Sequence, residues 1–214
     1  MKTYSQDNQD IYILEQFFPH KRDGVFVDIG AHDGVTISNS LLFEEIGWSG
    51  ICVEPLPKIF EQLKQNRKCQ CVNGVISNKD VDYVSFCAID GYAEMLSGII
   101  DAYDPLHKIR ILNESAAYGC TRQKIQVQNF KFNELIKFKH IQLLDIDTEG
   151  GELEILKSIN YELYNIDLIL VENNYNNADM RAFLTTKNFE HVIKLGADDL
   201  FKHSKVNNHI NNNR

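Results

Sequence analysis

The sequence predicts an α/β fold in which helices cover both faces of a mostly parallel sheet. Two observations lead to this prediction. Short apolar runs, typical of buried strands, recur along the 214-residue chain, and most of them precede a segment whose apolar residues have helical spacing. Strands that alternate with helices form right-handed βαβ units, and such units build a parallel sheet. The length is that of one domain, which we place at residues 1–204.

Three apolar runs form the first half of the predicted sheet. Residues 25–29, VFVDI, are the first strand, and residues 38–46 follow with helical spacing. Residues 51–53 are the second strand, residues 57–66 the next helix, and residues 71–76 the third strand. We expect these strands to be parallel, because a helix connects each one to the next.

The middle of the chain breaks this alternation. Residues 81–88 alternate between apolar and polar like a half-buried strand, residues 105–113 are predicted to be helical, and residues 124–130 form another strand. An insertion that covers the open end of the sheet would give this pattern. We place this insertion at residues 80–130.

The last third of the chain returns to the alternation and then ends differently. Two short alternating runs flank Gly196 in FEHVIKLGADDLFKHS, the pattern of an antiparallel hairpin at a sheet edge. Residues 205–214, KVNNHINNNR, contain too few apolar residues to order themselves, and we expect a disordered tail. The other predicted elements of this third are strands at residues 141–146 and 168–171 and helices at residues 152–159 and 178–187.

The composition argues against several classes of protein. No run approaches the roughly 18 consecutive apolar residues of a membrane span, and the first residues, MKTYSQDNQD, lack the basic and apolar regions of a secretory signal. We therefore expect a cytoplasmic protein. A formal charge of −8 without a dense Lys/Arg cluster argues against nucleic acid as a partner. Five cysteines, none in a Cys-x-x-Cys pair, indicate reduced thiols rather than disulfides or a zinc site.

The turn after the first predicted strand is the first candidate binding site. In VFVDIGAHDG the strand ends near Asp28, and Gly30 and Gly34 follow it. Ligands of a parallel sheet bind beyond the carboxyl ends of the strands, and glycines at that position let a ligand approach the backbone. Tight strand-to-helix turns that bind nothing also contain such glycines, so the turn alone does not define a site.

A second acid supports a nucleotide at this position. Glu54 ends the second predicted strand, where a carboxylate can accept hydrogen bonds from both hydroxyls of a ribose. A dinucleotide fingerprint would need glycine where the chain has His32 and Val35, so a nicotinamide-dependent oxidoreductase ranks last. Asp28 favours a cationic ligand, and the sulfonium and amino groups of S-adenosylmethionine (SAM) meet that requirement.

A second acidic cluster lies at the carboxyl ends of two later strands. Asp147 follows one predicted strand, and Glu172 and Asn173 end the next. Because neighbouring parallel strands end at the same rim, we expect these three side chains to bind a divalent cation such as Mg²⁺, Mn²⁺ or Ca²⁺. For Glu149 and Glu152 an equally good alternative is that they stabilise the start of the following helix.

With these residues in view, the chain resembles the FkbM family of SAM-dependent methyltransferases. The likeness extends from YSQDNQDIYIL to KLGADDLF and depends on FVDIGAHDGVTISNS, GWSGICVEP, CVNGVIS, DTEGGELEIL and LILVENNY in that order. The resemblance implies a Rossmann-like class I methyltransferase fold, with a mostly parallel seven-stranded sheet and an antiparallel edge hairpin. It also implies O-methyl transfer, with a hydroxyl of a sugar in a glycan or glycoconjugate as the acceptor.

The resemblance further implies roles for individual residues. Asp28 and the turn glycines would line the methionine part of SAM, Glu54 would hold the ribose, and residues 73–76 would border the adenine. The opening segment resembles a family SQxGQD element that closes over the site, with Asn8 in place of the glycine. The full set of cofactor-binding candidates is Gln9, Asp28, Gly30, His32, Gly34, Ser38, Asn39, Glu54, Pro55, Asn73, Gly74, Val75 and Asp147.

Methyl transfer to a sugar hydroxyl requires that the hydroxyl become more nucleophilic. We expect a metal at Asp147 to lower the pKa of the acceptor hydroxyl and His107 to act as the general base. His32, beside the glycine turn, competes for the role of base, and a structural role is the simpler alternative for His107. Two other functions remain open: methylation of a lipid, a protein or a small natural product, and SAM binding without catalysis.

Overall fold

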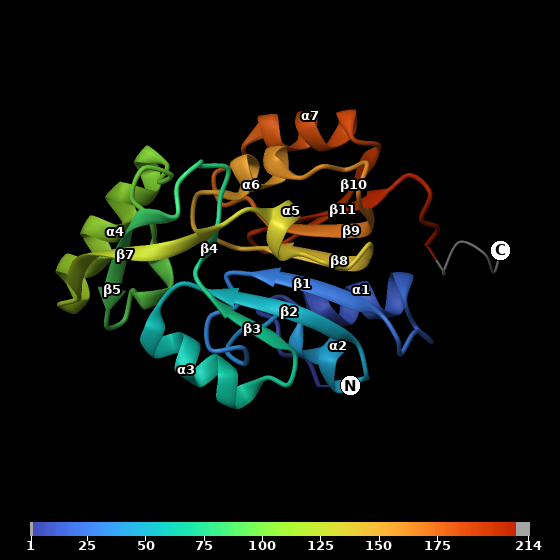
Figure 1. Cartoon of the computed structure of the whole chain (residues 1–214), viewed down its shortest axis with the longest axis horizontal. Coiled ribbons are helices and arrows are strands. Elements are labelled where there is room, and N and C mark those ends of the chain that lie inside the picture. The colour runs from blue at the N-terminus through green and yellow to red at the C-terminus, as the bar shows by residue number, and fades with distance from the viewer. Residues whose placement is uncertain (1, 209–214) are drawn as a thin grey trace.

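The computed structural model describes residues 2–208 and confirms the α/β fold, with seven strands in the main sheet (Figure 1). These strands are β1 (Val25–Ile29), β2 (Ser49–Glu54), β3 (Gln70–Asn73), β8 (His140–Ile146), β9 (Asn165–Glu172), β10 (Phe189–Leu195) and β11 (Asp198–His203). Their order is β10-β11-β9-β8-β1-β2-β3. The strands from β3 to β9 are parallel, and β11 is antiparallel to both of its neighbours. This is a Rossmann-like α/β sheet with the expected antiparallel edge hairpin.

Alternating side chains of the parallel strands supply two apolar cores, one on each face of the sheet. In β1, Phe26 packs into the core on one face and Val27 into the core on the other. Helices α1 to α3 cover the first face and α5 to α7 the second, below and above the sheet in Figure 1. The helices are α1 (Gln9–Phe17), α2 (Leu41–Glu45), α3 (Pro57–Asn66), α5 (Phe132–Leu135), α6 (Glu152–Ser158) and α7 (Ala178–Thr186).

Two segments near the carboxyl ends of the strands differ from the sequence-based expectation. The helix expected at residues 38–46 begins only at Leu41. It follows a loop in which His32 and Ile37 have positive φ angles of 49° and 48°. The strand expected at residues 71–76 divides at Gly74. Beyond that glycine, β4 (Val75–Ile76) leaves the main sheet. The residues just before α2 and the break at Gly74 both lie at the edge where ligands of such folds bind.

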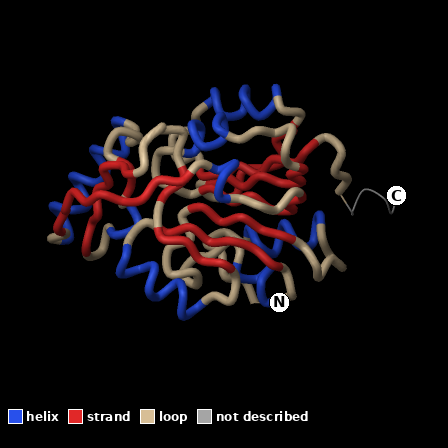
Figure 2. Tube along the Cα trace, in the orientation of Figure 1, coloured by secondary structure: helices blue, strands red, loops and turns tan. Residues whose placement is uncertain are grey.

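Residues 80–130, which we call the cover, form most of a second, smaller sheet together with two helical segments. The strands β5 (Tyr83–Asp90), β6 (Gly98–Ile99) and β7 (Thr121–Phe130) join β4 in a second sheet, ordered β4-β7-β5-β6. A short 3₁₀ helix, η1 (Glu94–Leu96), and α4 (Pro105–Tyr118) complete the cover. Figure 2 shows this second group of strands extending beyond one end of the main sheet.

The end of the chain differs in part from the disordered tail expected at residues 205–214. Val206 packs against the core beneath α1, and its N–H donates to the carbonyl oxygen of His203. Residues 209–214 lie outside the described residues. In the range 2–208, no helix combines the length and the apolar character needed to cross a membrane.

Candidate active site

A cavity of about 900 Å³ lies at the carboxyl ends of the parallel strands and is bounded on its other side by the cover. An open parallel sheet binds its ligands at this position. The predicted site residues that line the cavity are Gln9, Asp28, Gly30, His32, Ser38, Asn39, Glu54, Pro55, Gly74, Val75, Asp147 and Glu172. The predicted site residues that do not line it are Gly34, Asn73, His107 and Asn173.

The turn glycines make room for the protein itself. At Gly30, with a φ of +100°, a Cβ atom would overlap the carbonyl oxygen of Asp147, the residue after the neighbouring strand β8. At Gly34, with a φ of +78°, a Cβ atom would lie 2.6 Å from both Leu63 and Arg67 of the α3 region. The turn is therefore shaped by close packing against β8 and α3, which differs from the expectation that both glycines admit a ligand.

We expect Gly30→Ala to lower the free energy of unfolding by about 3 kcal/mol or more, because it adds both a steric overlap and an unfavourable φ. The matched control is Gly119→Ala at the end of α4. Gly119 has a similar positive φ of +67°, but its Cβ would meet no described atom within 4 Å, so a loss of about 1 kcal/mol is expected. Urea unfolding of both variants measures the difference, and equal losses would contradict this account of the turn.

Glu54 is buried at the tip of β2 and is fixed there by the backbone. One carboxylate oxygen accepts from the N–H of Leu56 at 2.7 Å and the other from the N–H of His32 at 3.1 Å. Burial raises the pKa of Glu54 to about 8, despite these two hydrogen bonds. Each oxygen keeps capacity for another donor, as a ribose hydroxyl would require. Asn73 has a different role, because its amide donates to the carbonyl oxygens of Glu54 and Pro55 and so supports the turn.

Asp28 is held from behind by a buried ionic network. The hydroxyl of Ser40 donates to Asp28 and accepts from Arg67 at 3.1 Å. The Arg67 guanidinium also donates to the carboxylate of Glu44 at 2.8 Å and to the carbonyl oxygen of Gly34 at 3.2 Å. Burial raises the pKa of Asp28, and the nearby guanidinium opposes that shift. Arg67 therefore connects α3, the loop after β1 and the acid at the cavity wall.

We expect Arg67→Met to destabilise the protein by about 3 to 5 kcal/mol, because it leaves the buried acids Asp28 and Glu44 without their cation. The control is Lys58→Met, which removes an exposed ion pair to Asp90 and costs about 1 kcal/mol or less. Chemical denaturation of the two variants compares them. Similar losses of stability would show that Arg67 does not organise this loop.

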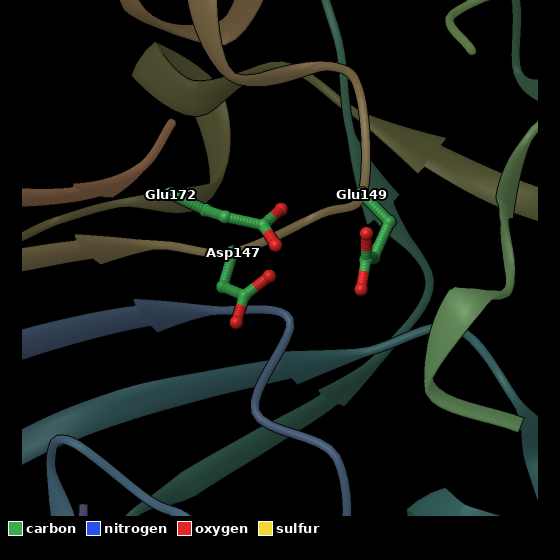
Figure 3. Close-up of side chains that lie close together, drawn as sticks. All are labelled: Asp147, Glu149 and Glu172. Atoms are coloured by element: carbon green, nitrogen blue, oxygen red, sulfur yellow. The ribbon is translucent and has the colours of Figure 1, made fainter. Parts of the chain in front are cut away.

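Three carboxylates meet on the far wall of the cavity, as Figure 3 shows. Oxygen atoms of Asp147, Glu149 and Glu172 all lie within 4.8 Å of one another. Burial raises the pKa of Asp147 to about 7, that of Glu149 to about 9, and that of Glu172 well above its usual range. Carboxylates this close do not all ionise without a compensating charge. Protons or a hard divalent cation would supply that charge, and an all-oxygen donor set suits Mg²⁺ or Mn²⁺.

Glu149 shows two further signs of a ligand site. Its φ is +57°, an uncommon conformation for a residue with a side chain. Its buried Oε2 atom accepts no hydrogen bond from any residue in the described part of the chain, and His107 Nδ1 lies 3.3 Å away. Backbone strain together with an unsatisfied buried oxygen is typical of a position that is held for function.

The third member of this oxygen cluster is Glu149, where the sequence predicted Asn173. The amide of Asn173 donates to Asp199 at 2.7 Å, and its oxygen accepts from the N–H of Asn177 at 2.7 Å, so both ends are engaged. Glu152 fits the alternative of a structural role at the start of α6. Its carboxylate accepts from the N–H groups of Thr148 and Gly150, as well as from the Thr148 hydroxyl.

His107 is a buried residue of α4, which weakens its case as the general base. Its ring stacks on Tyr103 with 4.9 Å between centroids, and Nε2 lies 3.3 Å from the carbonyl oxygen of Leu96. Burial lowers the pKa of His107. The side chain lies behind Glu149 and outside the cavity, whereas His32 lines the cavity with Nε2 3.3 Å from Glu94.

The predicted site residues did not include two buried acids of the cavity wall. Asp198, at the start of β11, accepts from the amide of Gln9 at 2.7 Å, and burial raises its pKa to about 6. Asp145, in β8, accepts from the amide of Asn39 at 3.3 Å. The acidic pair DD after Gly196 was the available signal for Asp198, since buried acids in an apolar strand are rare. The wall therefore carries acids from β1, β2, β8 and β11, which favours a cationic ligand.

The chain thus combines a Rossmann-like α/β fold with an acid-lined cavity at the carboxyl ends of its parallel strands. A family model of the methyltransferase FkbM domain matches residues 28–195, which is more than half of the chain. The protein belongs to this family.

One solved structure gives a comparison of the whole fold. The crystal structure of methyltransferase FkbM from Methylobacillus flagellatus KT aligns with a TM-score of 0.49 and 11% sequence identity. The alignment covers 85% of this chain and 44% of the other, so the chain spans less than half the length of that protein. No curated protein matches the sequence significantly.

Proposed function

We propose that the protein is a SAM-dependent O-methyltransferase whose acceptor is a hydroxyl of a sugar in a glycan or glycoconjugate. The observation that carries the cofactor assignment is the position of Glu54 and Asp28, two buried acids at the tips of adjacent strands in one cavity. SAM combines a ribose with a sulfonium and an ammonium group. A fixed carboxylate for hydroxyls beside an acidic wall for cations suits that combination. Membership of the FkbM family supports methyl transfer as the reaction.

The residues of the cavity would bind and orient the reactants. When bound, SAM would supply an electrophilic methyl carbon. In the transfer, the acceptor oxygen forms a bond to this carbon, and the carbon–sulfur bond breaks with both electrons left on sulfur. Glu54 holds the ribose, and the wall of Asp28 and Asp145 attracts the positive charge. Alignment of this kind can contribute several kcal/mol to catalysis. His32 is the histidine on the cavity wall and the better candidate to take the acceptor proton.

Asp147, Glu149 and Glu172 would hold a divalent ion. Such an ion, when bound, lowers the pKa of a coordinated hydroxyl. The support for this assignment is the close approach of three buried carboxylates with raised pKa values and the unsatisfied Oε2 atom of Glu149. The same wall also borders the space left for an acceptor, since residues of the cover complete the cavity.

The test is a calorimetric titration of S-adenosylhomocysteine (SAH) into the purified protein, with EDTA and again with added Mn²⁺. Micromolar binding of one SAH per chain is expected, together with binding of one Mn²⁺ by the EDTA-treated protein. No heat of SAH binding under either condition would remove the proposal. SAH binding without any Mn²⁺ uptake at millimolar concentration would remove only the metal.

A further inference from the structure

A groove extends the cavity from the acid cluster into the cover. Arg110, Glu114 and Tyr118 follow one another at intervals of four residues in α4, so they share one face of the helix, and all three line the cavity. Residues 92–97, from the segment between β5 and β6, line the same cavity. The groove thus has a regular wall on α4 and an irregular wall on the loop that contains η1.

The end of this groove carries a pair of exposed aromatic rings. Tyr92 and Tyr118 stack with 4.0 Å between their centroids and an angle of 30° between the ring planes. The two residues are nevertheless 70% and 57% exposed. Each ring therefore covers one face of the other and leaves apolar surface open to solvent beside the cavity. A ligand with a flat apolar face and polar edges, such as a pyranose ring, is suited to this surface.

The distance along α4 sets a minimum length for a ligand that reaches both ends. Arg110 lies at the end of the groove near Glu149, because His107, about one turn earlier in α4, has its Nδ1 atom 3.3 Å from Glu149 Oε2. Tyr118 is eight residues further along, which corresponds to about 12 Å of helix at 1.5 Å per residue. One sugar ring cannot occupy the acid cluster and the tyrosine pair at once. Two or more linked rings can.

The charge of the groove restricts the chemistry of the distal ring. The Arg110 guanidinium is engaged by Glu114 at 2.8 Å, and Lys79 is engaged by Asp101 at 3.0 Å. The remaining acids on the wall include Glu94, so the groove keeps a negative excess. An acidic sugar would be repelled by this surface.

We propose that the acceptor is a chain of at least two linked sugar rings, and that its distal ring, neutral or amino-substituted, stacks on the Tyr92–Tyr118 pair. The ring to be methylated then lies at the acid cluster. This inference rests on the proposed function, because it places the acceptor in the same cavity as the cofactor. Tyr92 and Tyr118 determine which acceptors are used, without contacting the reacting atoms.

The experiment incubates the protein, SAM with a tritiated methyl group and Mn²⁺ with an array of neutral, amino and acidic saccharides from one to six rings. Label is expected on neutral or amino oligosaccharides, with neither single rings nor acidic chains labelled. For the best acceptor, Tyr118→Ala should lower kcat/KM about tenfold, mainly through KM, because an aromatic stacking contact has roughly that value. Tyr118→Phe should stay near wild type, since it keeps the ring. Tyr83→Ala is the control, because Tyr83 is 60% exposed in the cover but does not line the cavity.

SAH titration of the same preparations distinguishes a failure of the proposed function from a failure of the inference about the acceptor. Absence of SAH binding would refute the proposed function itself. SAH binding with no saccharide labelled would overturn both the inference and the sugar acceptor of the proposed function, and would leave only the cofactor assignment. Equal labelling of single rings, label confined to acidic chains, or unchanged kcat/KM in Tyr118→Ala would each overturn the inference alone.

Discussion

Glu54→Gln is expected to weaken SAH binding at least 100-fold while making the ligand-free protein more stable at alkaline pH. The loss of affinity follows from the carboxylate itself, which offers acceptor oxygens to two ribose hydroxyls where an amide offers one oxygen and two donors. The backbone N–H groups of His32 and Leu56 now bond to both carboxylate oxygens, and the amide nitrogen cannot accept from them. Calorimetry of wild type and variant measures the affinity, and a change of less than threefold would contradict the ribose assignment.

The stability gain has a definite pH window. Burial raises the folded-state pKa of Glu54 from 4.5 to about 8, so the folded state holds this proton more tightly than the unfolded chain. The favourable contribution of the protonated group is therefore complete below pH 4.5 and is lost as the pH rises to about 8. One pKa unit corresponds to about 1.4 kcal/mol, so the loss is on the order of 5 kcal/mol. Glutamine carries no charge and lacks this loss.

Urea unfolding at pH 5 and pH 8.5 tests that window. The variant should gain stability relative to wild type between the two pH values, and the difference cancels the titrations that both proteins share. If the two proteins lose stability in parallel, Glu54 does not carry a buried charge in the folded state. A site residue that destabilises the free protein is expected where function and stability compete.

Glu172→Gln is expected to lower turnover on the order of 10³-fold and to abolish Mn²⁺ uptake, with SAH affinity changed less than threefold. The variant removes one of three oxygen ligands and leaves Asp147 and Glu149 in place. Glu154→Gln is the control, since Glu154 is a carboxylate on the same cavity wall outside the cluster. Turnover is measured on an oligosaccharide acceptor from the array. Normal turnover by Glu172→Gln in the presence of EDTA would show that the cluster binds no catalytic metal.

The sheet could be predicted from sequence because its signal is local. The strands β1, β2, β8 and β9 each contain an apolar run, and a helix follows each of them. The second strand's acid, Glu54, was predicted at its observed place because the end of a strand is also a local feature. The hairpin around Gly196 was readable for the same reason.

The parts of the site that escaped sequence reasoning depend on contacts between distant segments. Asn173 was expected to bind a metal, but its amide meets Asp199 on the neighbouring strand β11. Glu149 lies in the site with a positive φ angle, which its neighbours in the sequence do not predict. His107 was correctly predicted to lie in a helix. The burial of its side chain depends on packing against Tyr103, which the sequence pattern does not show. Pairings of this kind are set by tertiary structure and leave no pattern in a single sequence.

The most direct test of the whole account is a crystal structure of the protein with SAH. We expect the two ribose hydroxyls to lie within hydrogen-bonding distance of the Glu54 carboxylate. We also expect the amino group of SAH to lie beside Asp28 or Asp145 and the sulfur atom to point toward Asp147. A nucleoside bound elsewhere, or one in this cavity without a contact to Glu54, would contradict the central claim that these strand tips form a SAM site.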